Sequence, residues 1–545
     1  MSLSIIRTPS AYASPLLVNS ILEAGVRGAP DQEIVYAGKL RMTYRELGER
    51  VNRLASALTT LGVKPGDTVA VMDWDSHRYL ECFFAIPMMG AVLHTVNVRL
   101  SPEQILYTIN HAKDDVMLVN REFLPILDAI RDRIEPVKKF VLLDDGDGPE
   151  DSAIELAGEY EALLKAASSA FSFPDLDENT RATTFYTTGT TGLPKGVYFS
   201  HRQLVLHTYA GRAALGGSGH GRFNANDIYM PITPMFHVHA WGIPYMATMM
   251  GVKQVYPGRY EPATLLKLLV TEKVTFSHCV PTIIQMLLGA EAAKSIDLSG
   301  WKVIIGGSAL PPALARAALE RGIDIYTGYG MSETCPLITL ALLPPALENA
   351  DLDTQVKYRT MTGRPVPMVQ LRIVDENMND VPHDGKAQGE VVARAPWLTQ
   401  GYLHDKDNSE HLWHGGWLHT GDIATMSEDG WLKIADRIKD VIKTGGEWVS
   451  SIDLEGLVLQ HPAVAECAVI GVADEKWGER PLALVVKKPG AEVDEQAIKD
   501  VVMDYANKGV ISKYGVPDRV KFVEALPRTS VGKLDKKKMR AEMAD

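Results

Sequence analysis

Residues 186–196 have the chemistry of a phosphate cradle. The segment reads Tyr-Thr-Thr-Gly-Thr-Thr-Gly-Leu-Pro-Lys-Gly, with four threonines, three glycines and one lysine. Glycine lets the backbone approach a ligand closely, threonine supplies hydroxyl groups, and Lys195 supplies positive charge. The segment is not a Walker A loop, because Lys195 is followed by Gly196 rather than by serine or threonine. It predicts a polyphosphate site, and the alternative is a polar, flexible loop that only joins two elements.

Two short segments further along the chain carry groups that could bind a nucleoside. Residues 329–334, Tyr-Gly-Met-Ser-Glu-Thr, offer an aromatic ring and a carboxylate, although Ser332 could instead cap an exposed helix. Residues 419–422, His-Thr-Gly-Asp, end in a carboxylate that can accept two hydroxyl donors, although the segment could also be a plain turn.

Two charged segments in the last quarter of the chain also have both a functional and a structural interpretation. Residues 436–447 begin Asp-Arg-Ile-Lys-Asp, a run that is also typical of a solvated connector. Residues 527–533, Pro-Arg-Thr-Ser-Val-Gly-Lys, end in Lys533, which could simply belong to the basic tail that continues with the lysines at 536–538.

Taken together and in this order, the five segments resemble the motif series of the adenylate-forming enzymes. That family contains acyl-CoA synthetases, peptide-synthetase adenylation domains and luciferases. It usually has serine where this chain has Thr188, a difference that keeps the hydroxyl group. The similarity covers about residues 30–540. It is strongest to the bacterial medium- and long-chain fatty acyl-CoA synthetases, notably in residues 306–309 and 445–448.

The resemblance implies an α/β fold of the acyl-adenylate-forming type. We expect a large N-terminal domain of α/β subdomains over residues 1–438, which binds ATP and the acyl group. A small, mobile α+β domain over residues 439–545 would carry Lys533. Lys439 occupies the hinge position between the two domains.

The resemblance also implies roles for individual residues. Lys533, Glu333 and Arg437 match catalytic positions, and Thr190 and Glu333 match positions that hold Mg²⁺. The ring of Tyr329 would stack on adenine, and Asp422 would accept hydrogen bonds from the ribose hydroxyls. The full expected ATP and AMP site is Thr187, Thr188, Gly189, Thr190, Thr191, Gly192, Lys195, Gly307, Ser308, Tyr329, Gly330, Met331, Ser332, Thr334, Asp422 and Arg437.

Two further sites follow from the resemblance. The acyl pocket would be formed by His237, Val238, Trp241, Gly242 and Gly306, although a histidine at 237 could also be a satisfied core residue. Coenzyme A would pass along Lys443, Gly445, Gly446 and Trp448.

The reaction implied is an acid–thiol ligation. A carboxylate and ATP give acyl-AMP and pyrophosphate, and acyl-AMP and coenzyme A then give acyl-CoA and AMP. ATP, Mg²⁺ and coenzyme A are the expected cofactors and co-substrates. We expect a medium- or long-chain fatty acid as the acid. The alternatives are a short, thioether or aryl acid, an enzyme that loads a carrier protein, and a nucleotide-binding protein without turnover.

Several local patterns predict the elements that position these segments. Thr43 and Glu46 form a capping box before a helix whose apolar residues continue to Leu61, and Gly62 can end it. A buried strand is expected at 68–72. The acidic, polar stretch 144–180 is interpreted as a surface excursion. A compact αβ-like pattern begins after about residue 439.

Composition limits the class of protein. A chain of 545 residues is longer than a single hydrophobic core usually serves, so we expect more than one domain. The formal net charge of −12 argues against non-specific binding to nucleic acid. Four widely spaced cysteines predict reduced thiols rather than disulfides or a zinc site. No signal peptide and no membrane-spanning run is predicted. We therefore expect a cytoplasmic enzyme, and the resemblance also allows a homodimer.

Overall fold

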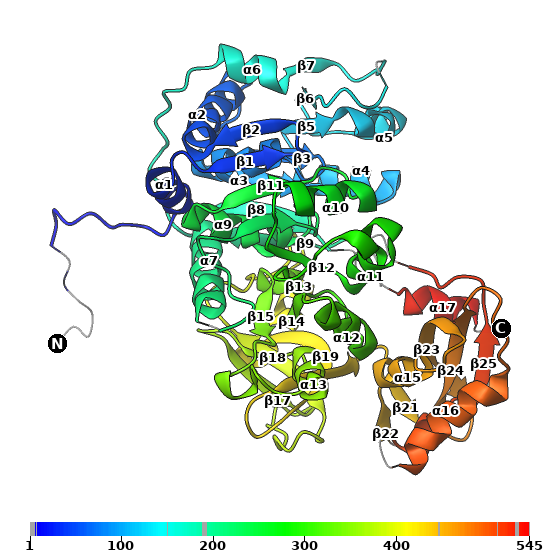
Figure 1. The fold of residues 1–545 in the computed structure, drawn as a ribbon. Coiled ribbons are helices and arrows are strands. Elements are labelled where there is room, and N and C mark those ends of the chain that lie inside the picture. Colours follow the sequence, from blue (N-terminus) through cyan, green and yellow to red (C-terminus); the bar gives the residue numbers. More distant parts are fainter. Residues whose placement is uncertain are drawn as a thin grey trace.

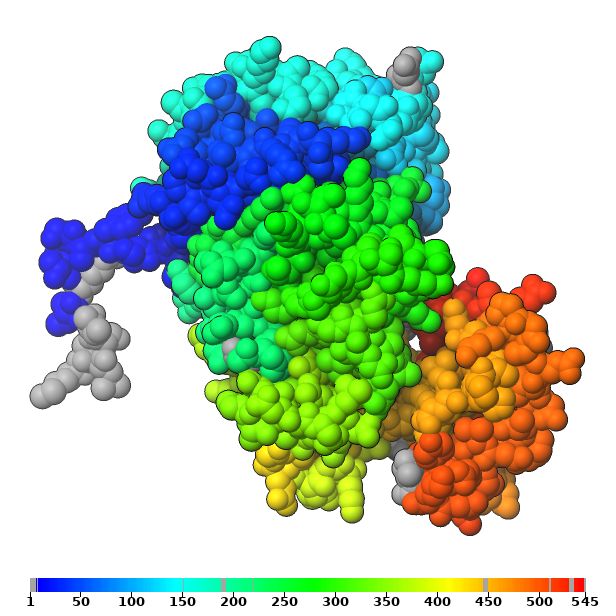
Figure 2. Space-filling model, in the orientation of Figure 1, coloured from blue at the N-terminus to red at the C-terminus, as the bar shows by residue number. Residues whose placement is uncertain are grey.

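The computed structural model describes residues 6, 8–149, 151–187, 193–217, 219–444, 447–508, 511–528 and 534–543, without the side chains of Glu447 and Trp448. Four sheets organise these residues, three in a large body and one in a smaller C-terminal unit (Figure 1). Figure 2 shows the C-terminal unit as a lobe beside the larger body. This arrangement confirms the predicted fold class, while the boundary at residue 438 stays a prediction.

A nine-stranded sheet contributes most of the candidate site. Its strands, in spatial order, are β16 (Arg364–Pro365), β15 (Leu337–Leu340), β14 (Asp324–Gly330), β13 (Lys302–Ile305), β12 (Phe276–Cys279), β10 (Ile228–Pro231), β11 (Lys253–Tyr256), β1 (Glu33–Tyr36) and β2 (Leu40–Thr43). The strands from β14 to β1 run parallel, so their carboxyl ends share one edge. In open parallel sheets, ligands bind at this edge.

A seven-stranded sheet carries the predicted phosphate loop. Its order is β7 (Leu156–Glu159), β6 (Lys139–Leu143), β5 (Val116–Asn120), β3 (Thr68–Met72), β4 (Val92–Thr95), β8 (Arg181–Tyr186) and β9 (Gly196–Ser200). Only β8 and β9 pair antiparallel, and the segment between them is the predicted loop. The buried strand expected at 68–72 is β3, whose five residues are all buried.

Two smaller sheets complete the chain. The four-stranded one has the order β17 (Gln370–Val374), β18 (Gly389–Arg394), β19 (Leu418–Met426) and β20 (Leu432–Arg437). The C-terminal one has the order β22 (Glu447–Val449), β21 (Ile442–Thr444), β24 (Gly478–Lys487) and β23 (Val464–Asp474), with β25 (Arg519–Phe522) also paired to β24.

Helices cover these sheets. In chain order they are α1 (Asn19–Gly28), α2 (Tyr44–Thr60), α3 (His77–Met88), α4 (Pro102–Ala112), α5 (Leu124–Ile130), α6 (Tyr160–Ala166), α7 (His201–Gly216), α8 (Val238–Trp241), α9 (Ile243–Met250), α10 (Pro262–Thr271), α11 (Pro281–Gly289), α12 (Pro312–Glu320), α13 (Leu352–Arg359), α14 (Lys406–Leu412), α15 (Ser451–Val458), α16 (Glu495–Asn507) and α17 (Lys536–Glu542). Short 3₁₀ turns lie at η1 (Arg121–Phe123), η2 (Arg131–Arg133), η3 (Glu291–Ser295), η4 (Ser332–Thr334), η5 (Pro345–Leu347), η6 (His414–Gly416) and η7 (Lys513–Gly515).

The predicted capping box starts α2. The Thr43 hydroxyl accepts the Glu46 amide N–H, and the Glu46 carboxylate accepts the Thr43 amide N–H at 2.6 Å. α3 lies wholly inside the body, because all twelve of its residues are buried. No described helix is both long enough and apolar enough to cross a membrane. The four cysteines are all buried and free, as predicted.

One prediction about the fold was wrong. The stretch 144–180 is not simply a surface excursion, because β7 extends the seven-stranded sheet beside β6 and α6 packs next to it. Tyr160 and Leu164 of α6 are buried, and Glu161 pairs with Arg50 of α2 at 2.7 Å. The local excess of acidic and small residues hid two short elements that long-range contacts stabilise.

Candidate active site

The described residues close the base of the predicted phosphate loop. Tyr186 and Gly196 are paired across β8 and β9. Just beyond them, the Thr187 amide donates to the Lys195 carbonyl at 2.9 Å, and the Lys195 amide donates to Thr187 Oγ1 at 3.3 Å. Thr188, Gly189, Thr190, Thr191 and Gly192 lie outside the described residues. The strands therefore fix both ends of the loop at one edge of the sheet.

A chain of side chains links the loop base to the 329–334 segment. Lys195 Nζ lies 4.6 Å from the centre of the Tyr402 ring, and the Tyr402 hydroxyl donates to Glu333 Oε1 at 2.7 Å. Glu333 itself is buried in η4. No local pattern pointed to Tyr402, whose role depends on a contact across about seventy residues of sequence.

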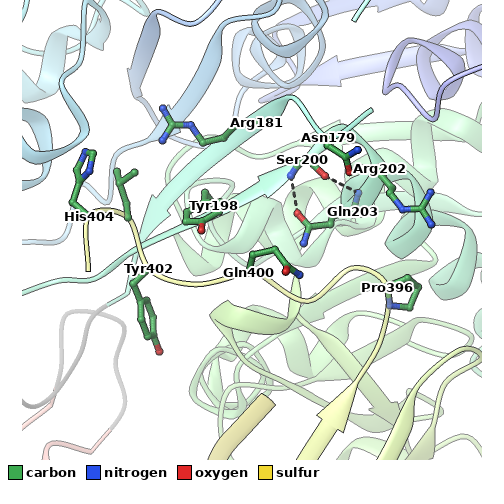
Figure 3. Close-up of a pocket in the computed structure, with 11 residues that line it drawn as sticks. Asn179, Arg181, Tyr198, Ser200, Arg202, Gln203, Pro396, Gln400, Tyr402 and His404 are labelled. Atoms are coloured by element: carbon green, nitrogen blue, oxygen red, sulfur yellow. Dashed lines mark hydrogen bonds between the residues drawn. The ribbon is translucent and has the colours of Figure 1, made fainter. Parts of the chain in front are cut away.

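A groove of about 410 Å³ lies beside β8 and β9, and Tyr402 is one of its lining residues. Figure 3 shows the Tyr402 side chain pointing away from Tyr198 and Ser200. None of the residues predicted from the sequence lines this groove. Tyr402 is thus shared between this groove and the contacts to Glu333 and Lys195.

A second cluster joins three residues that the sequence predicted separately. Asp422 and Arg437 are opposite each other in the β19–β20 pair, and Arg437 Nε lies 2.5 Å from Asp422 Oδ1. The Tyr329 hydroxyl donates to Asp422 Oδ2 at 2.7 Å. The Asp422 carboxylate raises the pKa of Arg437, so the guanidinium stays charged. This cluster offers an aromatic ring, a buried carboxylate and a cation together.

The turn that carries Tyr329 needs a glycine next to it. A methyl group at Gly330 would lie 1.6 Å from the Pro336 carbonyl oxygen. Thr334 Oγ1 accepts the Met331 amide N–H at 2.9 Å, which holds η4 in place. Ser332 is not the N-cap residue of a helix, so the alternative interpretation of this segment is wrong. Met331 and Ser332 are half-buried, and Gly307 and Ser308 are exposed just after β13.

The five predicted acyl-pocket residues lie on an unusual turn and beside it. Val238, His239, Ala240 and Trp241 all have left-handed backbone, with φ between 48° and 57°, and Gly242 follows with φ of 72°. Left-handed backbone costs an L-residue roughly 1–2 kcal/mol, so surrounding contacts must hold this turn. His237, just before it, is half-buried rather than a core histidine.

Two hydrogen bonds anchor the chain immediately before the turn. The Met235 amide donates to Asp75 Oδ1 at 2.8 Å, and Thr95 Oγ1 donates to the Phe236 carbonyl at 3.0 Å. Burial raises the pKa of Asp75 to about 7. A methyl group at Gly242 would lie 2.7 Å from the His207 ring, so the turn also needs this glycine. Nothing in the local sequence predicted these anchors.

The described members of the predicted hinge and coenzyme A sites lie near the start of the small domain. Lys439 lies in the connector between β20 and β21. Lys443 is exposed on β21 and is paired in register with Trp448 on β22. Gly445, Gly446 and Lys533 lie outside the described residues, as does the Trp448 side chain.

The donor set fits a Mg²⁺ ion that a nucleotide carries. The described residues contain no group of three or more histidine, cysteine or acidic side chains that could hold a metal. Glu333 supplies one carboxylate, whose Oε1 accepts a hydrogen bond from Tyr402. Mg²⁺ is commonly held by one or two carboxylates together with substrate phosphates rather than by an all-protein cage.

Comparisons with known proteins cover nearly the whole chain. Residues 22–403 match the AMP-binding enzyme family, and residues 453–533 match the AMP-binding enzyme C-terminal domain. A 3-methylmercaptopropionyl-CoA ligase of Ruegeria lacuscaerulensis is 40% identical over 542 residues, covering 97% of this chain and 98% of the relative. A long-chain-fatty-acid–CoA ligase of Thermus thermophilus is 40% identical over 510 residues, covering 92% and 90%. A medium-chain-fatty-acid–CoA ligase of Ectopseudomonas oleovorans is 38% identical over 539 residues, covering 97% and 96%.

Solved structures share this architecture. The anthranilate CoA ligase AuaEII in complex with anthranoyl-AMP superposes with a TM-score of 0.83 at 25% identity, covering 98% of both chains. ATP-bound MatB from Rhodopseudomonas palustris superposes with a TM-score of 0.82 at 25% identity, covering 97% of this chain and 99% of that one.

Proposed function

Since the chain belongs to the AMP-binding enzyme family and is an AMP-forming acid–CoA ligase, we propose that it binds ATP and activates a carboxylic acid with a largely apolar tail. The observation that supports the ATP site is that both groups of contacts meet the segment at the end of β14, where Tyr329 contacts Asp422 and Glu333, in η4, contacts Tyr402. A medium- or long-chain fatty acid is the first candidate acid. A short thioether acid is the alternative, and relatives at about 40% identity support each.

The first step joins the acid to AMP. A carboxylate oxygen attacks the α-phosphate of ATP, the new P–O bond gives acyl-AMP, and pyrophosphate leaves. The barrier is mainly the approach of an anion to a polyanion. The hydroxyl and amide groups of residues 187–192, with Lys195, hold the β- and γ-phosphates. Lys533 bridges the carboxylate and the α-phosphate. Thr190 and Glu333 would hold Mg²⁺, which would neutralise part of the phosphate charge.

The nucleoside is held by the second cluster. The Tyr329 ring stacks on adenine, Asp422 accepts the ribose hydroxyls, and Arg437 contacts ribose or phosphate. Gly330, Met331, Ser332 and Thr334 shape the turn under the base. Gly307 and Ser308 separate the adenine from the acyl pocket formed by His237, Val238, Trp241, Gly242 and Gly306.

The second step transfers the acyl group to coenzyme A. The thiol attacks the acyl carbon, the C–O bond to AMP breaks, and the products are acyl-CoA and AMP. The small domain turns about Lys439 between the two steps, so that Lys533 withdraws. Lys443, Gly445, Gly446 and Trp448 then line the path of the thiol. Such motion assembles the site for each step in turn, and it does not itself accelerate the chemical steps.

The test is AMP formation from ATP across a panel of acids, each with and without coenzyme A. The panel contains acetate, butyrate, octanoate, palmitate, benzoate and 3-(methylthio)propionate. CoA-dependent turnover that peaks at one acid supports the proposal and identifies the substrate. Pyrophosphate release without CoA-dependent formation of a thioester would point to a carrier-protein acceptor. Absence of AMP with every acid would overturn the proposal.

A further inference from the structure

The indole of Trp241, a member of the proposed acyl pocket, contacts two neighbours. A methyl group on Gly306 would lie 2.9 Å from an indole carbon, so the ring already touches the backbone after β13. The ring also lies against His278 of β12, with ring centres 4.9 Å apart and planes 36° apart. The left-handed turn and its anchors hold the indole there. The proposed acyl pocket, of which Trp241 and Gly306 are members, therefore borders His278.

His278 is not an apolar wall. Its side chain is fully buried at the carboxyl end of β12, beside β10 and β13. Nε2 lies 2.8 Å from the Tyr229 hydroxyl. Nδ1 has no hydrogen-bond partner within the described part of the chain. A buried polar atom without a partner is costly, and in native proteins it calls for an explanation. A substrate atom that pairs with Nδ1 would supply one.

The imidazole also limits the charge of that substrate atom. Burial lowers the pKa of His278 to about 3, so the ring is neutral at physiological pH. Tyr229 is equally buried and keeps its proton, because burial raises the pKa of its hydroxyl well above the ordinary value. A neutral imidazole can donate or accept one hydrogen bond, but it offers no countercharge to a second carboxylate.

We propose that His278 is a specificity-determining residue that recognises an uncharged heteroatom in the distal part of the acyl chain. The substrate is then a carboxylic acid with an ether, thioether, hydroxyl or carbonyl group rather than an unsubstituted fatty acid. This inference rests on the proposed function, and between its two candidate acids it favours the heteroatom acid over the fatty acid. A site built to pair a polar atom discriminates against an analogue that lacks it, because the protein group is then left unpaired.

Acids of equal length test this directly. For the wild-type enzyme, kcat/KM is measured for 3-methoxypropionate, 3-(methylthio)propionate, 4-oxopentanoate and pentanoate. We expect at least one heteroatom acid to exceed pentanoate about tenfold or more. In His278→Leu this ratio should fall to about one, because the heteroatom acids lose the partner that distinguishes them from pentanoate. His278→Gln, which restores a donor and an acceptor, should recover part of the preference.

Two results would overturn the inference: a wild-type ratio near one for all three acids, or a ratio that survives in His278→Leu. If His278→Leu does not fold, calorimetric binding of the sulfamoyl-adenosine analogues of 3-methoxypropionate and pentanoate to the wild-type protein decides instead. Equal affinity refutes the proposal, and about tenfold tighter binding of the methoxy analogue supports it. Failure of the ligase function is distinguishable, because no acid would then yield AMP.

Discussion

Asp422 is the carboxylate on which the candidate nucleotide site most directly depends. Its two oxygens hold Tyr329 and Arg437, and its side chain is only 3% exposed. Hydrogen bonds to a charged group contribute about 1.5–3 kcal/mol. We therefore expect Asp422→Asn to lower kcat/KM for ATP by about 10- to 100-fold, measured by AMP formation.

The matched control for that substitution is Asp353→Asn. Asp353 pairs with Arg316 on the surface, where its side chain is 81% exposed. Exposed ion pairs contribute little to the stability of the fold, and this variant should therefore keep the wild-type kinetics. A wild-type KM and kcat for ATP in Asp422→Asn would exclude Asp422 from nucleotide binding.

Single residues differ in how far the sequence could predict them. Tyr329, Asp422 and Arg437 occur in recognisable local motifs, and the structure brings them together, although their roles stay proposals. Tyr402 and His278 occur in no such motif, since each matters only through a contact made by folding. The left-handed turn was also missed, because four successive non-glycine residues with positive φ contradict local backbone preferences.

α17 is the element that follows the segment containing Lys533, and its attachment is a buried ion pair. Lys536 Nζ lies 2.7 Å from Glu455 Oε1 of α15 and also donates to Ser451 Oγ at 2.5 Å. Ser451 in turn donates its amide N–H to Asp436 Oδ2 at 2.6 Å. Lys536 is therefore buried, whereas Lys538 of the same basic run is exposed.

Breaking this pair should destabilise the small domain. Lys536→Met leaves the Glu455 carboxylate buried without its cation, which typically costs about 3–5 kcal/mol. Urea unfolding should show that loss. The double variant Lys536→Met with Glu455→Gln should recover much of it, and Lys538→Met, on the exposed face of α17, should change nothing. Unchanged stability of Lys536→Met would show that the pair contributes no net stabilisation.

The elements themselves were partly predictable. The capping box of α2, the apolar run of β3 and the αβ pattern after residue 439 are local signals, and each element forms where it was expected. Strand order could not be predicted, because it depends on pairing between distant segments. Val35 of β1, for example, pairs with Val255 of β11. β7 and α6 were missed because their stability comes from neighbours rather than from their own polar sequence.

Four buried imidazoles should make the molecule sensitive to acid. Burial lowers the pKa of His207, His239 and His278 to about 3, and that of His201 to about 4, in the folded state, whereas an unfolded histidine titrates near about 6.5. Below that pH the unfolded chain binds protons that the folded chain does not. Each imidazole therefore removes about 1.4 kcal/mol of stability per pH unit as pH falls from about 6.5.

Asp75 acts in the opposite direction over the same pH range. Its folded pKa of about 7 lies above its unfolded value, so between these values the folded chain binds the extra proton and offsets one imidazole. Urea unfolding between pH 8 and 5.5 should give a net loss of roughly 4 kcal/mol of stability per pH unit below about 6.5. His239→Phe keeps the aromatic packing around residue 239 and should reduce the slope by about 1.4 kcal/mol per pH unit. A slope equal to that of the wild type would refute this account of His239.

Single substitutions should impair one half-reaction without the other, because the proposed domain rotation brings a different lysine to the site in each step. Lys533→Ala removes the cation that bridges the carboxylate and the α-phosphate. Pyrophosphate release without coenzyme A should therefore fall by about 100-fold or more. Thioester formation from synthetic acyl-AMP and coenzyme A should persist, since Lys533 has withdrawn by then. Lys443→Ala, on the exposed side of β21, should show the reverse pattern. If Lys533→Ala lost both half-reactions equally, one fixed arrangement of the domains would have to serve both steps, and Lys439 would not act as a hinge.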